Sequence, residues 1–175
     1  MPESILSIKA PFDRAALATL PKNRVLAWYM KYATVFDADI HAASKQPTRF
    51  YASKAINYAP DGKINEGADA IWEDYLSLWG SFEKLTRDLR TIMFVTNEEE
   101  GTYRVHAECL TICHLKNDKG AVDVPTSFVY EIKEAEEGAG EDGLQIWEIR
   151  SYLDTAQLAK AKAQQEQYFL KVNEL

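Results

Sequence analysis

The sequence predicts an α+β fold, with helices on one face of a curved antiparallel sheet. Two patterns along the chain support this prediction. In the first half, apolar residues recur at spacings of three and four, as they do in helices with one buried face. From about residue 91 they recur at every second position, as in strands, and turn-forming segments separate these runs. Helices kept apart from a meander of strands are typical of this fold class.

The first half of the chain contains a helix, a strand and a second helix. The first helix is predicted over residues 24–40, with Asn23 as its start signal. Residues 49–60 alternate and run into the turn sequence PDGK, which predicts a strand. The second apolar stripe covers residues 64–85 and is interrupted near Gly80.

Three cationic residues, Lys84, Arg87 and Arg90, follow the second stripe at three-residue spacing. They could form an anion clamp, but a row of charges at this spacing is more typical of a solvated helix face. We therefore expect residues 83–90 to continue the helix into solvent.

The second half contains four strand candidates and a final helix. Hairpin turns are expected between the strands, with the acidic segment 134–143 as a mobile tip. Asp154 and Gln157 have the spacing of a capping box, so a helix is predicted directly after the last strand. The strand candidates are residues 91–97, 101–116, 122–134 and 144–154.

The length and composition of the chain limit the number of domains and the classes of partner that we expect. We expect one domain over residues 23–175, preceded by an N-terminal extension over residues 1–22. The net charge of −7 argues against a nucleic-acid partner, and no apolar run is long enough to span a membrane. The first residues lack the apolar core of a secretory signal, so a cytoplasmic location is expected. Cys109 and Cys113 are interpreted as packing residues.

The segment GLQIWEIRSYLDTAQL, residues 143–158, is similar to the last strand of the SnoaL-like family in the nuclear transport factor 2-like superfamily. The order of helices and strands over about residues 23–160 fits the same family. The resemblance implies a cone-shaped α+β barrel, in which a curved antiparallel sheet wraps around N-terminal helices and a C-terminal helix follows. It also implies a pocket between sheet and helices, and often a homodimer through the outer sheet face.

Enzymes of this superfamily need a general acid and a general base in an apolar pocket. In the strand 102–114, His106 and Glu108 share one face and lie about 7 Å apart at Cα, so they could divide these two roles. They occupy the positions of an Arg-x-Asp pair in the epoxide hydrolase branch. The same parity fits an outer, solvated face equally well.

The remaining site residues are predicted by comparison with the epoxide hydrolase branch and with the dehydratase branch. Ser151 stands where the epoxide hydrolase branch has a second aspartate, so that mechanism is not expected. Asp37 matches an aspartate of the dehydratase branch and is a catalytic candidate, with a structural role at the helix end as the alternative. Met93 stands where that branch uses a histidine. The candidates for substrate contacts are Tyr58, Tyr29, Met93, Trp147 and Ser151.

The predicted function is that of a cyclase, isomerase or dehydratase acting on a hydrophobic, oxygenated small molecule, in secondary metabolism. No metal or organic cofactor is expected. The alternative is a non-catalytic module of the same fold, which binds a small molecule or dimerises. The direction in which His106 and Glu108 point discriminates between the two functions.

Overall fold

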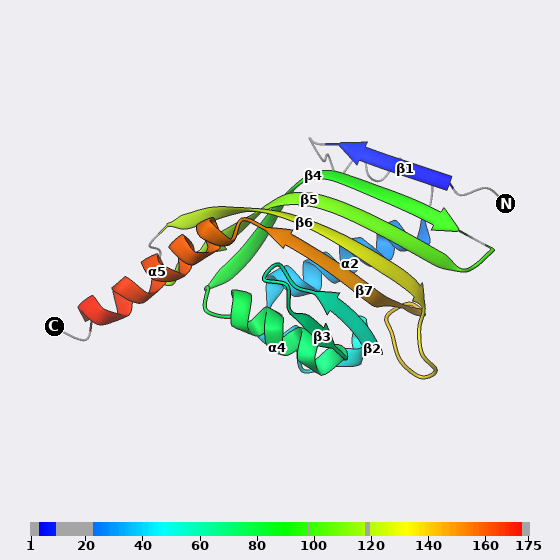
Figure 1. The fold of residues 1–175 in the computed structure, drawn as a ribbon, viewed down its shortest axis with the longest axis horizontal. Helices are drawn as coiled ribbons and strands as arrows, with labels where there is room; N and C mark the ends of the chain where they lie inside the picture. The colour runs from blue at the N-terminus through cyan, green and yellow to red at the C-terminus, as the bar shows by residue number, and fades with distance from the viewer. Residues whose placement is uncertain (1–3, 10–22, 98, 118–119, 173–175) are drawn as a thin grey trace.

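The computed structural model describes residues 4–9, 23–97, 99–117 and 120–172, and these residues form the predicted α+β fold (Figure 1). The helices are α2 (Arg24–Ala38), α3 (Ile40–Ala43), α4 (Ala68–Trp79) and α5 (Thr155–Val172), with a 3-10 turn over Pro47–Arg49. The strands are β1 (Ser4–Lys9), β2 (Tyr51–Tyr58), β3 (Ile64–Glu66), β4 (Lys84–Asn97), β5 (Thr102–His114), β6 (Ala121–Glu134) and β7 (Leu144–Leu153).

The strands form one curved sheet in the order β1-β4-β5-β6-β7-β2-β3. Hairpins connect β4 through β7 as predicted, and β2 pairs with β7 in parallel, so the sheet is mixed. Strand β1 pairs with β4, which makes part of the expected N-terminal extension an edge of the sheet. Because β1 and β3 lie at opposite ends of the strand order, the cone is an open sheet rather than a closed barrel.

Helix α2 lies under the concave face of the sheet and supplies much of the core (Figure 1). Asn23 caps its start, because its side-chain oxygen accepts hydrogen bonds from the backbone N–H groups of Val25 and Leu26 at 2.9 and 3.1 Å. The buried face of α2 is aromatic and packs against aromatic side chains from α4 and the sheet. These aromatic residues are Trp28, Tyr29, Tyr32, Phe36, Phe50, Tyr51, Trp72, Tyr75, Phe94, Phe128 and Tyr130.

Residues 84–90 are the first half of strand β4, not the solvated helix that their charge spacing predicted. Helix α4 ends with Gly80 as its C-cap, and the chain then alternates between the two faces of the sheet. Leu85 and Leu89 pack toward the core, and Arg87 shares their parity, so its side chain is buried rather than solvated. The three-residue spacing was misleading because it spans both faces of a strand.

The acidic segment 134–143, expected to be a mobile tip, is held against helix α2 and the start of β2. The Glu141 carboxylate contacts Arg49 at 2.7 Å and also pairs with Lys31. The ring N–H of Trp28 donates to the backbone oxygen of Glu141 at 2.7 Å. The acidic residues therefore fix this connection in place.

Helix α5 begins at the predicted cap and leads away from the sheet (Figure 1). The Asp154 side chain accepts from the backbone N–H of Gln157 at 3.0 Å, while its own N–H donates to the backbone oxygen of Pro125. Among the helices of the described residues, none has both the length and the apolar character needed to cross a membrane.

Candidate functional site

Two charged side chains meet on the concave side of the sheet, inside the aromatic core. Nε of Arg87, on β4, lies 3.3 Å from Oδ1 of Asp37, in the last turn of α2. The Arg87 side chain is 5% exposed and the Asp37 side chain 22%. The geometry does not make a hydrogen bond, so the contact is an ion pair only. Of the two groups, Asp37 is the one that solvent reaches.

The local sequence explains how these two groups come together. Helix α2 ends at Ala38, and Asp39 caps the following helix by accepting from the backbone N–H of Ala42 at 2.9 Å. Asp39 therefore does the capping, and Asp37 bridges to the sheet instead. On β4, Arg87 pairs with the buried Thr111 of β5, which places both on the concave face.

The Arg87 guanidinium lies between two aromatic rings. Its carbon is 4.3 Å from the ring centre of Phe36 and 5.6 Å from that of Phe128, which are cation–π distances. Burial alone would lower the pKa of Arg87, but the Asp37 carboxylate and nearby tyrosines raise it well above its ordinary value. The site therefore holds a permanent positive charge in apolar surroundings.

Two buried tyrosines interact electrostatically with Arg87, and Ser151 is a neighbour of one of them, Tyr75. Tyr29 from α2, Tyr75 from α4 and Ser151 from β7 are all buried. Burial raises the pKa of Tyr75 to about 12, and it raises the pKa of Tyr29 as well. Both phenols therefore stay protonated at neutral pH, so each carries an O–H group that can donate to a ligand. The hydroxyls of Tyr75 and Ser151 are neighbours, but they do not have the geometry of a hydrogen bond.

Five buried polar atoms of this group have no hydrogen-bond partner among the described residues. They are Oδ1 of Asp37, Nε and Nη1 of Arg87, the Tyr75 hydroxyl and the Ser151 hydroxyl. Buried polar atoms in folded proteins nearly always have partners, and each one left alone costs about 1–3 kcal/mol. We call Asp37, Arg87, Tyr75, Ser151 and Tyr29 the interior cluster. Its unpaired N–H and O–H groups are donors for the oxygens of a ligand, whereas the unpaired Asp37 oxygen is an acceptor.

Asp37 is the general-base candidate of the interior cluster. Burial raises the pKa of its carboxyl above the ordinary value of 3.8, and the charge of Arg87 limits the rise. A carboxylate with a raised pKa is a stronger base, and proton transfer is most efficient when the pKa of the base approaches the working pH.

The structure places His106 and Glu108 on the outer face of the sheet. Glu108 is exposed and His106 is half-buried, while the residues between and beside them, Val105, Ala107 and Cys109, are buried. The strict two-residue period of β5 turns its apolar residues inward and its polar residues outward. The structure therefore does not bring His106 and Glu108 together with Asp37, the third predicted catalytic residue. Their outward direction favours the non-catalytic alternative over an enzyme that uses this pair, so an enzymatic function has to rest on other residues. Burial and the charge of Arg104 lower the pKa of His106.

Of the predicted substrate contacts, Tyr29 and Ser151 lie in the interior cluster. Met93 pairs with His106 across β4 and β5 and shares its outer face. Tyr58 is 36% exposed. Its ring centre lies 5.1 Å from the guanidinium carbon of Arg150, outside the core.

Trp147 was expected to face the pocket together with Ser151, and the structure corrects this. Its ring N–H donates to the backbone oxygen of Glu134 at 3.3 Å, and its ring lies 5.9 Å from the Lys133 ammonium. The pairing of β6 with β7 is irregular between Glu131 and Ile132, next to Trp147. This irregularity breaks the simple alternation between Trp147 and Ser151.

Tyr75 and Arg87 are the members of the interior cluster that were not among the predicted site residues; Arg87 was considered only as part of an anion clamp, to which a solvated helix face was preferred. The alternation of Leu85, Arg87 and Leu89 was the signal for an inward-facing arginine, but the charge spacing led to a solvated helix instead. Tyr75 was assigned to the core stripe of its helix. That assignment is correct, but core and site share these residues.

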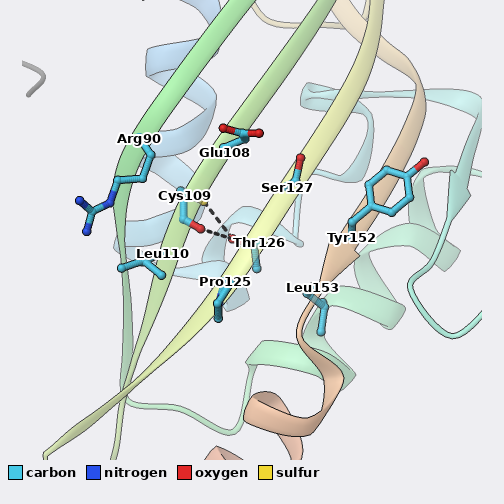
Figure 2. Close-up of a pocket in the computed structure, with 9 residues that line it drawn as sticks. All are labelled: Arg90, Glu108, Cys109, Leu110, Pro125, Thr126, Ser127, Tyr152 and Leu153. Carbon is cyan, nitrogen blue, oxygen red and sulfur yellow. Dashed lines mark hydrogen bonds between the residues drawn. The ribbon is translucent and has the colours of Figure 1, made fainter. Parts of the chain in front are cut away.

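A groove of about 540 Å³ lies on the outer face of the sheet (Figure 2). Arg90 and Tyr152 stand at its opposite sides, with Glu108 and Ser127 between them. Arg90 is paired with Asp88 at 2.6 Å, and both side chains are about half exposed. The volume of the groove falls in the range of ligand sites, but the charged residues that line the groove are paired or solvated.

The described residues contain no group of three or more His, Cys, Asp or Glu side chains arranged to hold a metal ion. Cys109 and Cys113 are free and buried, as expected of packing residues. The Cys109 sulfur lies 3.0 Å from the Thr126 hydroxyl. Burial raises the pKa of Cys113 to about 12, so its thiol is protonated at neutral pH.

No protein-family model and no curated protein matches this sequence. Solved structures do match its fold. A candidate dehydratase of the NTF2-like family from Streptomyces avermitilis is 10% identical, with a TM-score of 0.58 over 74% of this chain and 93% of that chain. A candidate SnoaL-like polyketide cyclase from Shewanella putrefaciens CN-32 is 14% identical, with a TM-score of 0.54 over 87% and 92%.

The chain is also similar to the CaMKII hub of S. rosetta, at 11% identity and a TM-score of 0.55 over 77% of this chain and 100% of that chain. These identities are low, so the likenesses concern the fold and not the chemistry. The protein has the fold of the nuclear transport factor 2-like superfamily, to which SnoaL-like proteins belong.

Proposed function

We propose that this protein is an enzyme that carries out acid–base chemistry on a hydrophobic, oxygenated small molecule bound at the interior cluster. One observation carries the proposal: a carboxylate, a guanidinium and two hydroxyls lie in an aromatic core, and some of their polar atoms have no hydrogen-bond partner among the described residues. An aromatic setting with a few unpaired polar groups is typical of a small-molecule site. Dehydratase and cyclase candidates among proteins of this fold are in keeping with this class of function.

In the proposed reaction, Asp37 removes a proton from a carbon next to a carbonyl group. The electron pair of the broken C–H bond moves onto the carbonyl oxygen, and the resulting enolate oxygen accepts hydrogen bonds from the Tyr75 and Ser151 hydroxyls. The positive charge of Arg87 stabilises this oxyanion. The carbonyl group then re-forms and the electron pair returns to carbon. In an isomerisation, the pair forms a new C–H bond at another carbon with the proton from Asp37. In a dehydration, the pair forms a C=C bond as the C–O bond of a neighbouring hydroxyl breaks, and this hydroxyl leaves as water with the proton from Asp37.

The test is proton exchange with a simple probe, 2-tetralone, in heavy water. The wild-type protein should speed the exchange of the protons next to the carbonyl above the rate in buffer, as followed by NMR. Asp37→Asn should slow the protein-dependent exchange by about a hundredfold or more. The matched control is Glu108→Gln on the outer face, which should leave the rate unchanged. Exchange that survives Asp37→Asn, or that depends on Glu108, would overturn the proposal.

A second candidate function is assembly through the outer sheet face, in which a homodimer forms. The observation in its favour is an outer face that combines partly buried apolar residues with an exposed tyrosine: Met93, Leu110, Val129 and Tyr152. The structural neighbours include a CaMKII hub. Sedimentation of the wild type and of Val129→Glu would test this function, since a dimer on this face should dissociate in the variant. A monomeric wild type at high concentration would contradict it.

A further inference from the structure

We infer that the substrate carries a carboxylate group, which binds the unpaired N–H groups of Arg87. This inference rests on the proposed function, because it concerns the same interior cluster. It restricts the proposed class of substrates from hydrophobic, oxygenated molecules in general to ring compounds with an acidic substituent. Three features of the cluster support it: the unpaired donors of Arg87, the aromatic rings beside it and the charge of the cluster.

The donors of Arg87 are the first observation. A guanidinium has five N–H donors and is always charged. In the described residues Nε and Nη1 have no acceptor, although the side chain is only 5% exposed. Asp37 supplies charge at 3.3 Å but no hydrogen bond. A structural ion pair normally uses its donors, because a buried charged donor without a partner is costly. An acceptor from outside the chain would satisfy them.

The surroundings of Arg87 indicate what the acceptor is attached to. Phe36 and Phe128 lie on the guanidinium at 4.3 and 5.6 Å, and Tyr29 and Tyr130 are also buried nearby. Because these four rings are only 1–4% exposed, a ligand group that reaches the guanidinium has aromatic rings around it rather than solvent. A carboxylate on a planar ring would contact both the guanidinium and the rings.

The charge of the cluster allows a second carboxylate beside Asp37. Arginine readily bridges two carboxylates, because its planar fork presents donors on more than one side. A ligand anion bound to Arg87 would also weaken the hold of the guanidinium on Asp37. The pKa of Asp37, already raised by burial, would then rise further toward neutrality. A substrate carboxylate would thus make Asp37 a stronger base for its own reaction.

The test compares two probes of the same shape, 2-naphthoate and the neutral 2-naphthamide, by titration calorimetry. Wild-type protein should bind naphthoate about tenfold or more tightly than naphthamide, as one hydrogen-bonded charge contact implies. Arg87→Met should abolish this preference. Arg90→Met is the matched control, because Arg90 lies three positions along the same strand but is half exposed and paired with Asp88. It should leave the preference unchanged.

A second variant, which keeps Arg87, tests the inference even if Arg87→Met does not fold. Asp37→Asn removes the carboxylate that competes for the guanidinium, so it should tighten naphthoate binding severalfold and leave naphthamide binding unchanged. Equal affinity for the two probes, or a preference that survives Arg87→Met, would overturn the inference. The proposed function would stand if 2-tetralone exchange still depended on Asp37. A naphthoate preference without any exchange would support the inference and remove the enzymatic proposal.

Discussion

Asp37 makes the stability of this protein depend on pH. Burial raises the pKa of its carboxyl in the folded state above its ordinary value of 3.8. A raised pKa means that folding favours the protonated form. The contribution of Asp37 to stability is therefore fully present below the unfolded pKa, and it is lost as the pH rises through the folded pKa.

We expect Asp37→Asn to remove this loss, since asparagine does not titrate. The difference in free energy of unfolding, wild type minus variant, should fall as the pH rises from about 3.8 through the folded pKa of Asp37. Urea unfolding at a series of pH values measures this difference. A difference that stays constant with pH, or that grows in favour of the wild type, would show that the carboxyl is not buried as described.

Two buried hydroxyls and a thiol lie within hydrogen-bond distance of one another in the core. The Thr126 hydroxyl lies 2.8 Å from that of Thr111 and 3.0 Å from the Cys109 sulfur. Thr126→Val should destabilise the protein by about 1–3 kcal/mol, because it leaves the buried Thr111 hydroxyl without this partner.

The double variant Thr111→Val/Thr126→Val should lose less stability than the sum of the two single variants, because it removes both members of the pair. Thr34→Val, at an exposed position on α2, is the control and should change stability little. Urea denaturation of all four variants decides the matter. Strict additivity would count against the hydrogen bond.

The connection between β6 and β7 shows how a charged element can be structural. Glu141 is only 16% exposed in its side chain and pairs with both Lys31 and Arg49. Glu141→Gln should loosen the connection, so that its amides exchange faster with heavy water. In the wild type, high salt should have the same effect, because salt screens ion pairs.

Glu137→Gln, at an exposed position of the same connection, provides the matched comparison. It should leave amide exchange at its wild-type rate. Equal exchange in both variants would mean that the ion pairs of Glu141 do not hold this segment.

The start of helix α5 is an element whose stability could be predicted from sequence alone. Asp154→Ala removes the cap hydrogen bond to Gln157 and should cost about 1 kcal/mol in the free energy of unfolding. Thr155→Ala, one residue on and exposed, should have little effect. Chemical denaturation compares the two. An equal loss in both variants would contradict a specific cap.

The sequence predicted a helix or strand correctly wherever the signal, such as an apolar repeat, a turn or a helix cap, lies within the element or next to it. The helix after Asn23, the strand before the PDGK turn and the four-strand meander all follow from nearby residues. The first half of β4 was not predicted, because charges at three-residue spacing imitate a helix face. The fixing of segment 134–143 was not predictable either, since its partners Lys31 and Arg49 are about a hundred residues away.

At the scale of the whole molecule, the fold could be predicted but the site only in part. The resemblance of the last strand led to the correct superfamily fold. Asp37, Tyr29 and Ser151, three of the residues predicted for the site, belong to the interior cluster, whose function stays a proposal. The packing of the whole sheet determines which face of β5 turns inward. His106 and Glu108 lie on the opposite, outer face, and the local sequence does not show this. Arg87 could be recognised only once β4 was known to be a strand.

We propose that the functional site lies at the interior cluster, under the concave face of the sheet. The decisive experiment is a crystal structure of the protein with bound 2-naphthoate. We expect the carboxylate within hydrogen-bond distance of Arg87, with the naphthalene ring beside Phe36 and Phe128. Density for the ligand only in the outer groove, between Arg90 and Tyr152, would contradict it.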